Sequence, residues 1–376
     1  MKTKNPFLTY GYISPEFFCD REEETATLIS ALENGRNITL VSSRRMGKTG
    51  LIHNAFHRIG KDMPEVKCFY LDIFPTNSLR EFTLLLAQTI LGQLDSFSET
   101  MLGRLTSFFK SCRPVVSVDS MTGAPSVTLD FVPDNAEQTL GEIFEYMKQS
   151  GRECVVAIDE FQQITEYPEK GAEAMIRSHI QFLPNVSFIF SGSKRHIMLD
   201  MFMSPKRPFY QSTQKMHIGS IDERKYHRFA ACHFAKRGIT MDEGTFHYLY
   251  TVLFGHTWYI QRLLNKVFEI CEGNVCEPDI NECIRIIISE EEFNFQQQLS
   301  MLTLNQRKLL TAIAKEGTVE SINGKDFLQS HSLGASSSIN RALENLLKNE
   351  FVMDNGNSYQ VYDRFMGIWL RVSCGF

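Results

Sequence analysis

The stretch NITLVSSRRMGKTGLI, residues 37–52, decides the fold. Its first five residues are typical of a short buried strand, and Gly47-Lys48-Thr49 stands where a helix is expected to begin. Strand, tight loop and helix in this order predict a phosphate-binding P-loop, because the loop N–H groups and the helix dipole receive phosphate. Lys48 would then contact the β- and γ-phosphates, and the Thr49 hydroxyl would bind Mg²⁺. The alternative is an ordinary strand–turn–helix connection with a solvated lysine.

The loop departs from the P-loop pattern at its first position, where Ser42 replaces glycine. If the backbone there needs a positive φ, a non-glycine residue costs about 1–2 kcal/mol, or up to about tenfold or somewhat more in affinity. Such a cost weakens a nucleotide site without abolishing it, so we predict a working site. The loop residues expected to contact nucleotide are Ser42, Ser43, Arg44, Arg45, Met46, Gly47, Lys48, Thr49 and Gly50.

An acidic pair follows a later strand. Asp159 and Glu160 end an apolar run that begins at residue 154, and such a run is typical of a strand buried on both faces. An aspartate at the carboxyl end of a neighbouring parallel strand is where a Mg²⁺ ligand is expected. Glu160 beside it would polarise the attacking water. Alone, such a pair is usually a solvated loop, but behind a P-loop it is the expected partner.

A third polar element, Ser191-Gly192-Ser193, ends the strand expected at 186–190. A hydroxyl there would orient water against the γ-phosphate, and we assign that role to Ser191. The alternative is a strand-capping turn, and the sequence does not separate the two.

Strands alternate with helices as far as residue 221, which predicts an α/β fold with a parallel sheet flanked by helices. Two alternating runs at about 111–135 predict a β-hairpin insertion in this first domain, 1–221. Strands are expected to stop after residue 221. Residues 222–300 form four or five expected helices, with breaks at glycines. In 301–376, three helices and a hairpin follow in winged-helix order.

Composition limits the function classes. The chain has 376 residues, 43% hydrophobic and 22% charged, which is typical of an ordinary soluble globular protein. A net charge of −5 argues against a chain that coats nucleic acid or anionic membrane. The nine cysteines include no CxxC pair, so neither a zinc site nor a disulfide framework is predicted. With no apolar h-region at the N-terminus and no run approaching the ~18 apolar residues of a span, we expect a cytoplasmic protein without membrane contact.

Four segments together resemble a known family. They are Phe18-Cys19-Asp20-Arg21-Glu22-Glu23-Glu24, the loop at 42–49, VVAIDEFQQI (155–164) and FIFSGSKRHIM (188–198). This succession resembles the archaeal-type ATPases, a STAND-like branch of the AAA+ P-loop NTPases, and bacterial ATP-binding proteins of that type. The resemblance covers nearly the whole chain. It implies an AAA+-like core, a helical lid, a C-terminal winged helix, and a box of Phe18, Arg21 and Glu24 over the adenine.

Two family motifs differ in this chain. In PFYQSTQ (208–214), many relatives carry Gly-Arg after the tyrosine where this chain has Gln-Ser, so the arginine finger is assigned to Arg207, with Arg195 second. Both arginines could equally be solvated. In FGHTWYIQRLL (254–264), Thr257 replaces the proline of an adenine-side motif, and His256 would contact nucleotide. Helix capping is the commoner role for such a histidine.

The expected winged helix carries little positive charge. Residues 301–376 contain eight Lys or Arg and seven Asp or Glu. The expected recognition helix, 336–349, carries Arg341 and Lys348 together with the acidic Glu344. Nonspecific DNA binding rests on several neutralised phosphates, so we expect a clamp or protein-contact module. The most basic stretch is 194–215, which would serve a γ-phosphate, a neighbouring subunit or nucleic acid.

The sequence therefore predicts an ATPase with ATP and Mg²⁺ as cofactors, acting as a slowly hydrolysing switch that couples nucleotide state to lid and winged-helix arrangement. Expected partners are ATP and ADP, with a protein partner or self-association; DNA is less favoured. Two alternatives stay open: a DNA-binding AAA+ ATPase of initiator or transposition-helper type, and a nucleotide-dependent scaffold without turnover. The charge distribution argues against the first, and Glu160 argues against the second.

Overall fold

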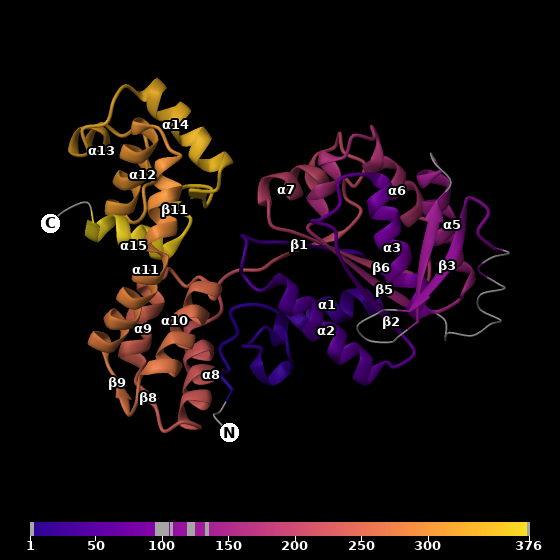
Figure 1. Cartoon of the computed structure of the whole chain (residues 1–376), viewed down its shortest axis with the longest axis horizontal. Helices are drawn as coiled ribbons and strands as arrows, with labels where there is room; N and C mark the ends of the chain where they lie inside the picture. Colours follow the sequence, from indigo (N-terminus) through magenta and orange to yellow (C-terminus); the bar gives the residue numbers. More distant parts are fainter. Residues whose placement is uncertain (1–3, 95–104, 106–107, 119–124, 132–134, 374–376) are drawn as a thin grey trace. The chain divides into compact units, whose positions relative to one another are not determined.

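The computed structural model describes residues 4–94, 105, 108–118, 125–131 and 135–373. They form two compact units, residues 10–221 and residues 222–373 together with 4–9 (Figure 1). The second unit contains both the expected lid and the expected winged helix, so the three-domain division stays a prediction. No helix in the described part of the chain combines the length and apolar character that a bilayer span requires.

The first unit is built on a five-stranded sheet in which every neighbouring pair is parallel. Its order, β2-β5-β6-β1-β7, places β6 between β1 and β5. Parallel strands bring their carboxyl ends to one edge, so the P-loop after β1 and the acidic pair after β5 lie at the same edge. The strands are β1 (Ile38–Val41), β2 (Lys67–Asp72), β5 (Cys154–Asp159), β6 (Val186–Gly192) and β7 (Gln214–His217).

Helices cover both faces of this sheet (Figure 1). Alternate side chains of β5 point to opposite faces: Val155 and Ala157 pack with α1 and α2, whereas Val156 and Ile158 pack with α3, α5, α6 and α7. Burial on both faces explains the continuous apolar run of this strand. The helices are α1 (Glu22–Glu33), α2 (Lys48–Asp62), α3 (Leu79–Leu94), α5 (Ala136–Gln149), α6 (Ala172–Ile180) and α7 (Arg195–Met203), with 3-10 turns η1 (Pro15–Phe17) and η2 (Phe161–Glu166).

The expected hairpin is present as a separate antiparallel pair, β3 (Cys112–Val118) and β4 (Pro125–Phe131). β4 contacts α3. The connection between the two strands, residues 119–124, lies outside the described residues.

The second unit begins with four helices, as predicted, but the expectation that strands stop after residue 221 is wrong. Two short strands, β8 (Thr240–Met241) and β9 (Asn274–Val275), pair in parallel. Two-residue strands are too short to show a period-2 pattern, so the sequence could not reveal them. The helices are α8 (Glu223–Ala235), α9 (Glu243–Val252), α10 (Thr257–Ile270) and α11 (Glu277–Ser300).

Residues 4–9 belong to this second unit, although they precede the first unit in sequence. Phe7 is fully buried, its ring lying 5.0 Å from that of Phe234 between centroids. Asn265 in α10 donates to the Phe7 carbonyl at 2.7 Å, and Asn5 donates to the Asn265 carbonyl at 2.9 Å.

The winged-helix order is also present, with one helix that the sequence did not predict. Helices α12 (Leu304–Glu316), α13 (Lys325–Ser330) and α14 (Ser336–Lys348) precede an antiparallel pair, β10 (Val352–Asp354) and β11 (Tyr359–Val361). The unpredicted helix is α15 (Arg364–Ser373). Its Phe365 and Trp369 rings lie 5.5 Å from Tyr259 in α10 and 5.6 Å from Phe295 in α11, so α15 joins the winged helix to the preceding helices.

Candidate functional site

The loop between β1 and α2 has the turn geometry that a phosphate loop needs. Gly47, which caps α2, has φ 94°, and Arg45 has φ 62°. Glycine adopts such angles at little cost, whereas a residue with a Cβ is strained there. These two residues turn the chain directly into the amino end of α2, where N–H groups face outward.

The strain considered for Ser42 is absent. Ser42 does not have a positive φ, because the left-handed positions of the loop are Arg45 and Gly47. Its side chain is fully buried, donates to the Ser43 carbonyl at 2.9 Å and accepts from Lys48 Nζ at 3.1 Å. The serine therefore makes contacts of its own, and the glycine of the common pattern is not required by the backbone at this position.

Lys48 lies inside the loop, with only 6% of the residue exposed. Its ammonium group donates to Ser42 Oγ and to the Ser43 carbonyl, both at 3.1 Å. Burial lowers the pKa of Lys48, while the carboxylates of Asp159 and Glu160 act in the opposite direction. The lysine is thus held by neutral oxygen acceptors beside two acids, and it is not a solvated surface side chain.

Thr49 and Asp159 meet as the sequence predicts for a metal site. Thr49 Oγ1 donates to Asp159 Oδ2 at 2.8 Å, and the Tyr70 hydroxyl donates to the same oxygen at 2.8 Å. The Glu160 N–H donates to the other carboxylate oxygen at 3.0 Å. Sequence reasoning missed Tyr70. The feature that could have indicated this contact is the position of Tyr70 on β2, the strand that pairs with β5.

The donor set at this point suits Mg²⁺. Both candidate ligand atoms are oxygens, which this cation prefers, and one belongs to a carboxylate. No group of three or more His, Cys, Asp or Glu side chains among the described residues is arranged to hold a metal. Mg²⁺ commonly uses one or two protein ligands together with phosphate oxygens and water. Thr49 and Asp159 therefore fit a nucleotide-associated magnesium ion.

Glu160 lies at the same edge in a left-handed conformation, with φ 54°. Its Oε2 accepts a hydrogen bond from Ser193 Oγ at 2.8 Å and another from Gln162 Nε2. The role that we expected for Ser191, orienting water against the γ-phosphate, stays a prediction. Ser191 is fully buried, and its hydroxyl has no hydrogen-bond partner among the described residues. The reason is that β6 continues to Gly192, so Ser191 lies within the sheet opposite Leu40, and Ser193 is the hydroxyl beyond the strand end.

The N-terminal box supports the loop from one side. The Arg21 guanidinium is 3% exposed; it donates to Glu24 at 2.7 Å, to the Gly219 carbonyl at 2.6 Å and to the Met46 carbonyl at 3.4 Å. The Phe18 ring packs on α2, where a Cβ built on Gly50 would lie 2.9 Å from it. Arg21 thus braces the phosphate loop, and an adenine contact by this box stays a prediction.

The remaining predicted residues lie elsewhere. Arg207, between α7 and β7, pairs with Glu173 at 2.8 Å and lies 3.4 Å from Asp200. Arg195 is exposed at the start of α7, directly after the β6 edge. His256 belongs to the second unit, where it occupies the N-cap position of α10 without a side-chain capping hydrogen bond. Neither the finger assignment nor nucleotide contact by His256 is decided by these positions, and both stay predictions.

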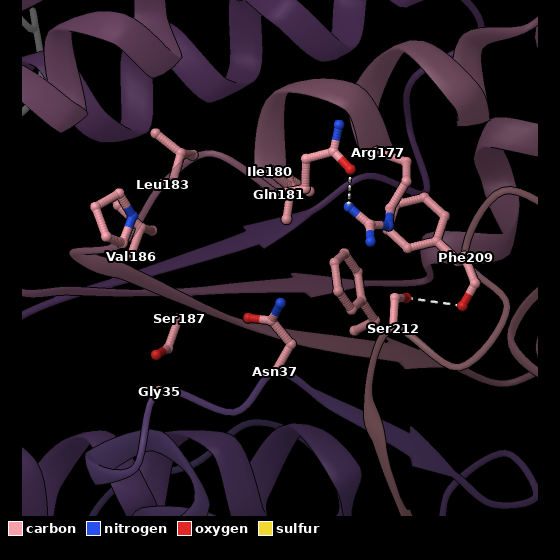
Figure 2. Close-up of a pocket in the computed structure, with 12 residues that line it drawn as sticks. Gly35, Asn37, Arg177, Ile180, Gln181, Leu183, Val186, Ser187, Phe209 and Ser212 are labelled. Carbon is pink, nitrogen blue, oxygen red and sulfur yellow. Dashed lines mark hydrogen bonds between the residues drawn. The ribbon is translucent and has the colours of Figure 1, made fainter.

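A separate cavity of about 320 Å³ lies at the opposite, amino ends of the strands (Figure 2). Figure 2 shows the guanidinium of Arg177 hydrogen-bonded to Gln181, on the side of the cavity across from Asn37. Ligands of open parallel sheets bind at the carboxyl ends. This cavity is therefore not part of the candidate nucleotide site.

Comparison with known proteins supports the architecture. A family model described as "Probable winged helix domain" matches residues 293–372. The Walker-type ATPase of Pyrococcus abyssi is similar in structure, with a TM-score of 0.64 and 18% identity over 97% of this chain and 99% of that chain. This chain has the fold of a P-loop ATPase with a C-terminal winged helix.

Two proteins of Aeropyrum pernix share this P-loop ATPase fold. The ORC2 protein, solved in ADPNP–ADP complexes, has a TM-score of 0.58 and 15% identity over 99% of this chain and 96% of that chain. The ORC1 protein, solved in complex with DNA, has a TM-score of 0.53 and 13% identity over 96% and 94%. A search of curated proteins finds no match. At these identities the likeness concerns the fold, and the STAND-like assignment stays a prediction.

Proposed function

We propose that this chain is a Mg²⁺-dependent ATPase that hydrolyses ATP slowly and uses nucleotide state as a switch. One observation carries the proposal: Thr49 Oγ1 lies 2.8 Å from Asp159 Oδ2, at the same sheet edge as Lys48 and Glu160. Four different side chains needed for P-loop chemistry thus converge from two strand ends.

Each of these residues has a distinct task. Lys48 donates to neutral oxygens of the loop, and phosphate oxygens would be stronger acceptors because they are charged. Thr49 and Asp159 would hold Mg²⁺, which neutralises charge on the β- and γ-phosphates when bound. Glu160 would accept a hydrogen bond from the attacking water, while Ser193 holds its carboxylate.

We expect turnover to be slow in the isolated chain. An arginine that neutralises the γ-phosphate in the transition state accelerates such reactions by about a thousandfold or more. The candidate Arg207 is engaged by Glu173 and Asp200 on the same unit. A partner or a second copy that supplies an arginine would raise the rate.

The switch proposal rests on Arg21. Its guanidinium joins the Met46 carbonyl of the phosphate loop to the Gly219 carbonyl, three residues before the second unit begins at residue 222. A loop that rearranges around phosphate would move one acceptor of this buried cation relative to the other. Arg21 is therefore a physical link between the nucleotide loop and the segment that leads to the lid and winged helix.

We propose that the winged helix makes protein contacts or acts as a clamp. Arg364, one of its eight cations, is 6% exposed, donates to the Val361 carbonyl at 3.0 Å and lies 4.8 Å above the Phe254 ring. This buried arginine is therefore not available to bind phosphate at the surface. DNA binding is the alternative. Two observations support it: the basic stretch at 194–215, and the ORC1 protein of similar fold that was solved in complex with DNA.

The test is ATP turnover and ATP affinity of wild type, Lys48→Ala and Glu160→Gln, each with and without duplex DNA. We expect Mg²⁺-dependent binding that Lys48→Ala abolishes and slow hydrolysis that DNA leaves unchanged. Molecular mass in ADP and in ATP would report nucleotide-controlled association. Equal ATP affinity of wild type and Lys48→Ala would refute the site, binding without hydrolysis would support the scaffold, and strong stimulation by DNA would support the DNA-dependent alternative.

A further inference from the structure

Gln162 lies two residues after Glu160, at the start of the 3-10 turn η2, and is 3% exposed. Its Nε2 donates to Glu160 Oε2, the same oxygen that accepts from Ser193 Oγ at 2.8 Å. Two donors from two neighbouring strand ends therefore converge on one oxygen of the candidate catalytic carboxylate. Among the described residues, no hydrogen bond to the other oxygen, Oε1, is formed.

The buried amide of Gln162 is held tightly in one orientation. The carboxylate requires a donor, so the amide nitrogen faces Glu160, and the amide oxygen has no hydrogen-bond partner among the described residues. A Cβ built on Gly192 would lie only 2.2 Å from this oxygen. The absence of a side chain at Gly192 thus makes room for the Gln162 amide against β6.

Stability alone does not explain a glutamine here. Leaving a buried polar group unsatisfied is unfavourable, and an apolar side chain of similar length would avoid that cost. The amide is retained at a position where its one hydrogen bond goes to Glu160. Buried polar groups that lower stability in this way are typical of functional sites.

We propose that Gln162 is a positioning residue for ATP hydrolysis. By occupying Oε2 together with Ser193, it fixes the Glu160 side chain and leaves Oε1 to accept a hydrogen bond from the attacking water. A carboxylate held in place loses less conformational freedom in the transition state, so its contribution appears in kcat. This inference rests on the ATPase function proposed above.

The chain offers a matched control in the next residue. The Gln163 side chain donates to the Thr76 carbonyl at 3.1 Å, so it serves the loop after β2. Its backbone N–H donates to the Glu160 carbonyl at 2.9 Å, a bond that a side-chain substitution keeps. Gln162→Met removes the donor while keeping the length of the side chain. We expect kcat to fall about ten- to a hundredfold, since hydrogen bonds to charged groups are worth that much. KM and ATP affinity should stay unchanged, and Tm should stay equal or rise.

Gln163→Met should keep the wild-type kcat. Ser193→Ala, which removes the second donor from a half-buried position, should lower kcat without changing ATP affinity. In a Glu160→Gln background, Gln162→Met should cause no further loss, because the two residues act as a unit.

Several results would overturn the inference. One is a wild-type or higher kcat in Gln162→Met, and another is an equal loss of kcat in the Gln163→Met control. A third is a full further loss of kcat when Gln162→Met is added to Glu160→Gln. The fourth is a lowered Tm with lost ATP binding in Gln162→Met. The last result would mark Gln162 as a structural residue. A wild type that does not hydrolyse ATP would instead refute the proposed function, and this inference with it.

Discussion

Replacing Tyr70 by phenylalanine is expected to weaken Mg²⁺ binding at the candidate site. The Tyr70 hydroxyl donates to Asp159 Oδ2 at 2.8 Å, beside the donor Thr49 Oγ1. The substitution removes this bond and keeps the ring, which lies 4.6 Å from that of His53 between centroids. A hydrogen bond to a charged group contributes about 1.5–3 kcal/mol, and loss of a residue that orients a metal ligand costs about 10- to 100-fold in metal affinity. We therefore expect half-saturating Mg²⁺ to rise about tenfold or more.

The assay is a Mg²⁺ titration of ADP binding by calorimetry, repeated for ATP turnover. Tyr12→Phe is the matched control, because its hydroxyl donates to Asn54 at 3.2 Å and its ring stacks on the same His53 at 5.9 Å. That substitution removes a hydroxyl without contacting Asp159, so the Mg²⁺ dependence should stay that of wild type. An unchanged half-saturation in Tyr70→Phe, or the same shift in both variants, would refute the reasoning.

Three further predictions test other parts of the molecule. Glu160→Gln should bind ATP like wild type while single-turnover hydrolysis falls about a hundredfold or more; a wild-type rate would show a mere loop carboxylate. Gly47→Ala should lower Tm and ATP affinity, because φ there is 94°, whereas Gly60→Ala within α2 should leave ATP affinity unchanged and stabilise by up to about 1 kcal/mol. Equal effects in the two variants would contradict this. In fluorescence anisotropy with duplex DNA at about 150 mM salt, binding should be weak and unaffected by Arg341→Ala/Lys348→Ala; sub-micromolar binding lost in that variant would favour a DNA reader.

Local sequence pattern was sufficient for the sheet and for the first contacts of the site. Strand β5 is apolar throughout because both faces are covered, and Lys48-Thr49 opens a helix directly after a strand. Such features depend on a few neighbouring residues, so a pattern reveals them. The contact between Thr49 and Asp159 followed from one additional rule, that parallel strands end at one edge.

The residues that sequence reasoning missed depend on register and on strand ends. Ser193, to which the sequence assigned no role, contacts Glu160 because β6 continues to Gly192, two residues beyond the predicted end. Tyr70 reaches Asp159 because β2 pairs with β5 in a register that sets Asp72 opposite Asp159. Sequence patterns define strand ends only to within a few residues. Which side chain at a sheet edge contacts a given group therefore depends on strand ends that a pattern does not define.

Backbone strain gives an independent argument for function at this edge. Eight non-glycine residues in the described chain have a positive φ, and four of them are Asp20, Arg21, Arg45 and Glu160. Two belong to the box that braces the loop, one to the loop itself, and one is the candidate catalytic acid. Each such residue costs about 1–3 kcal/mol, a cost that persists where the surrounding structure holds the backbone in place. The buried contacts of Arg21 and the two donors to Glu160 hold these positions here. Concentration of strain beside Lys48 and Asp159 is expected of a site that is pre-organised for a ligand, and it is not expected of an ordinary strand–turn–helix connection.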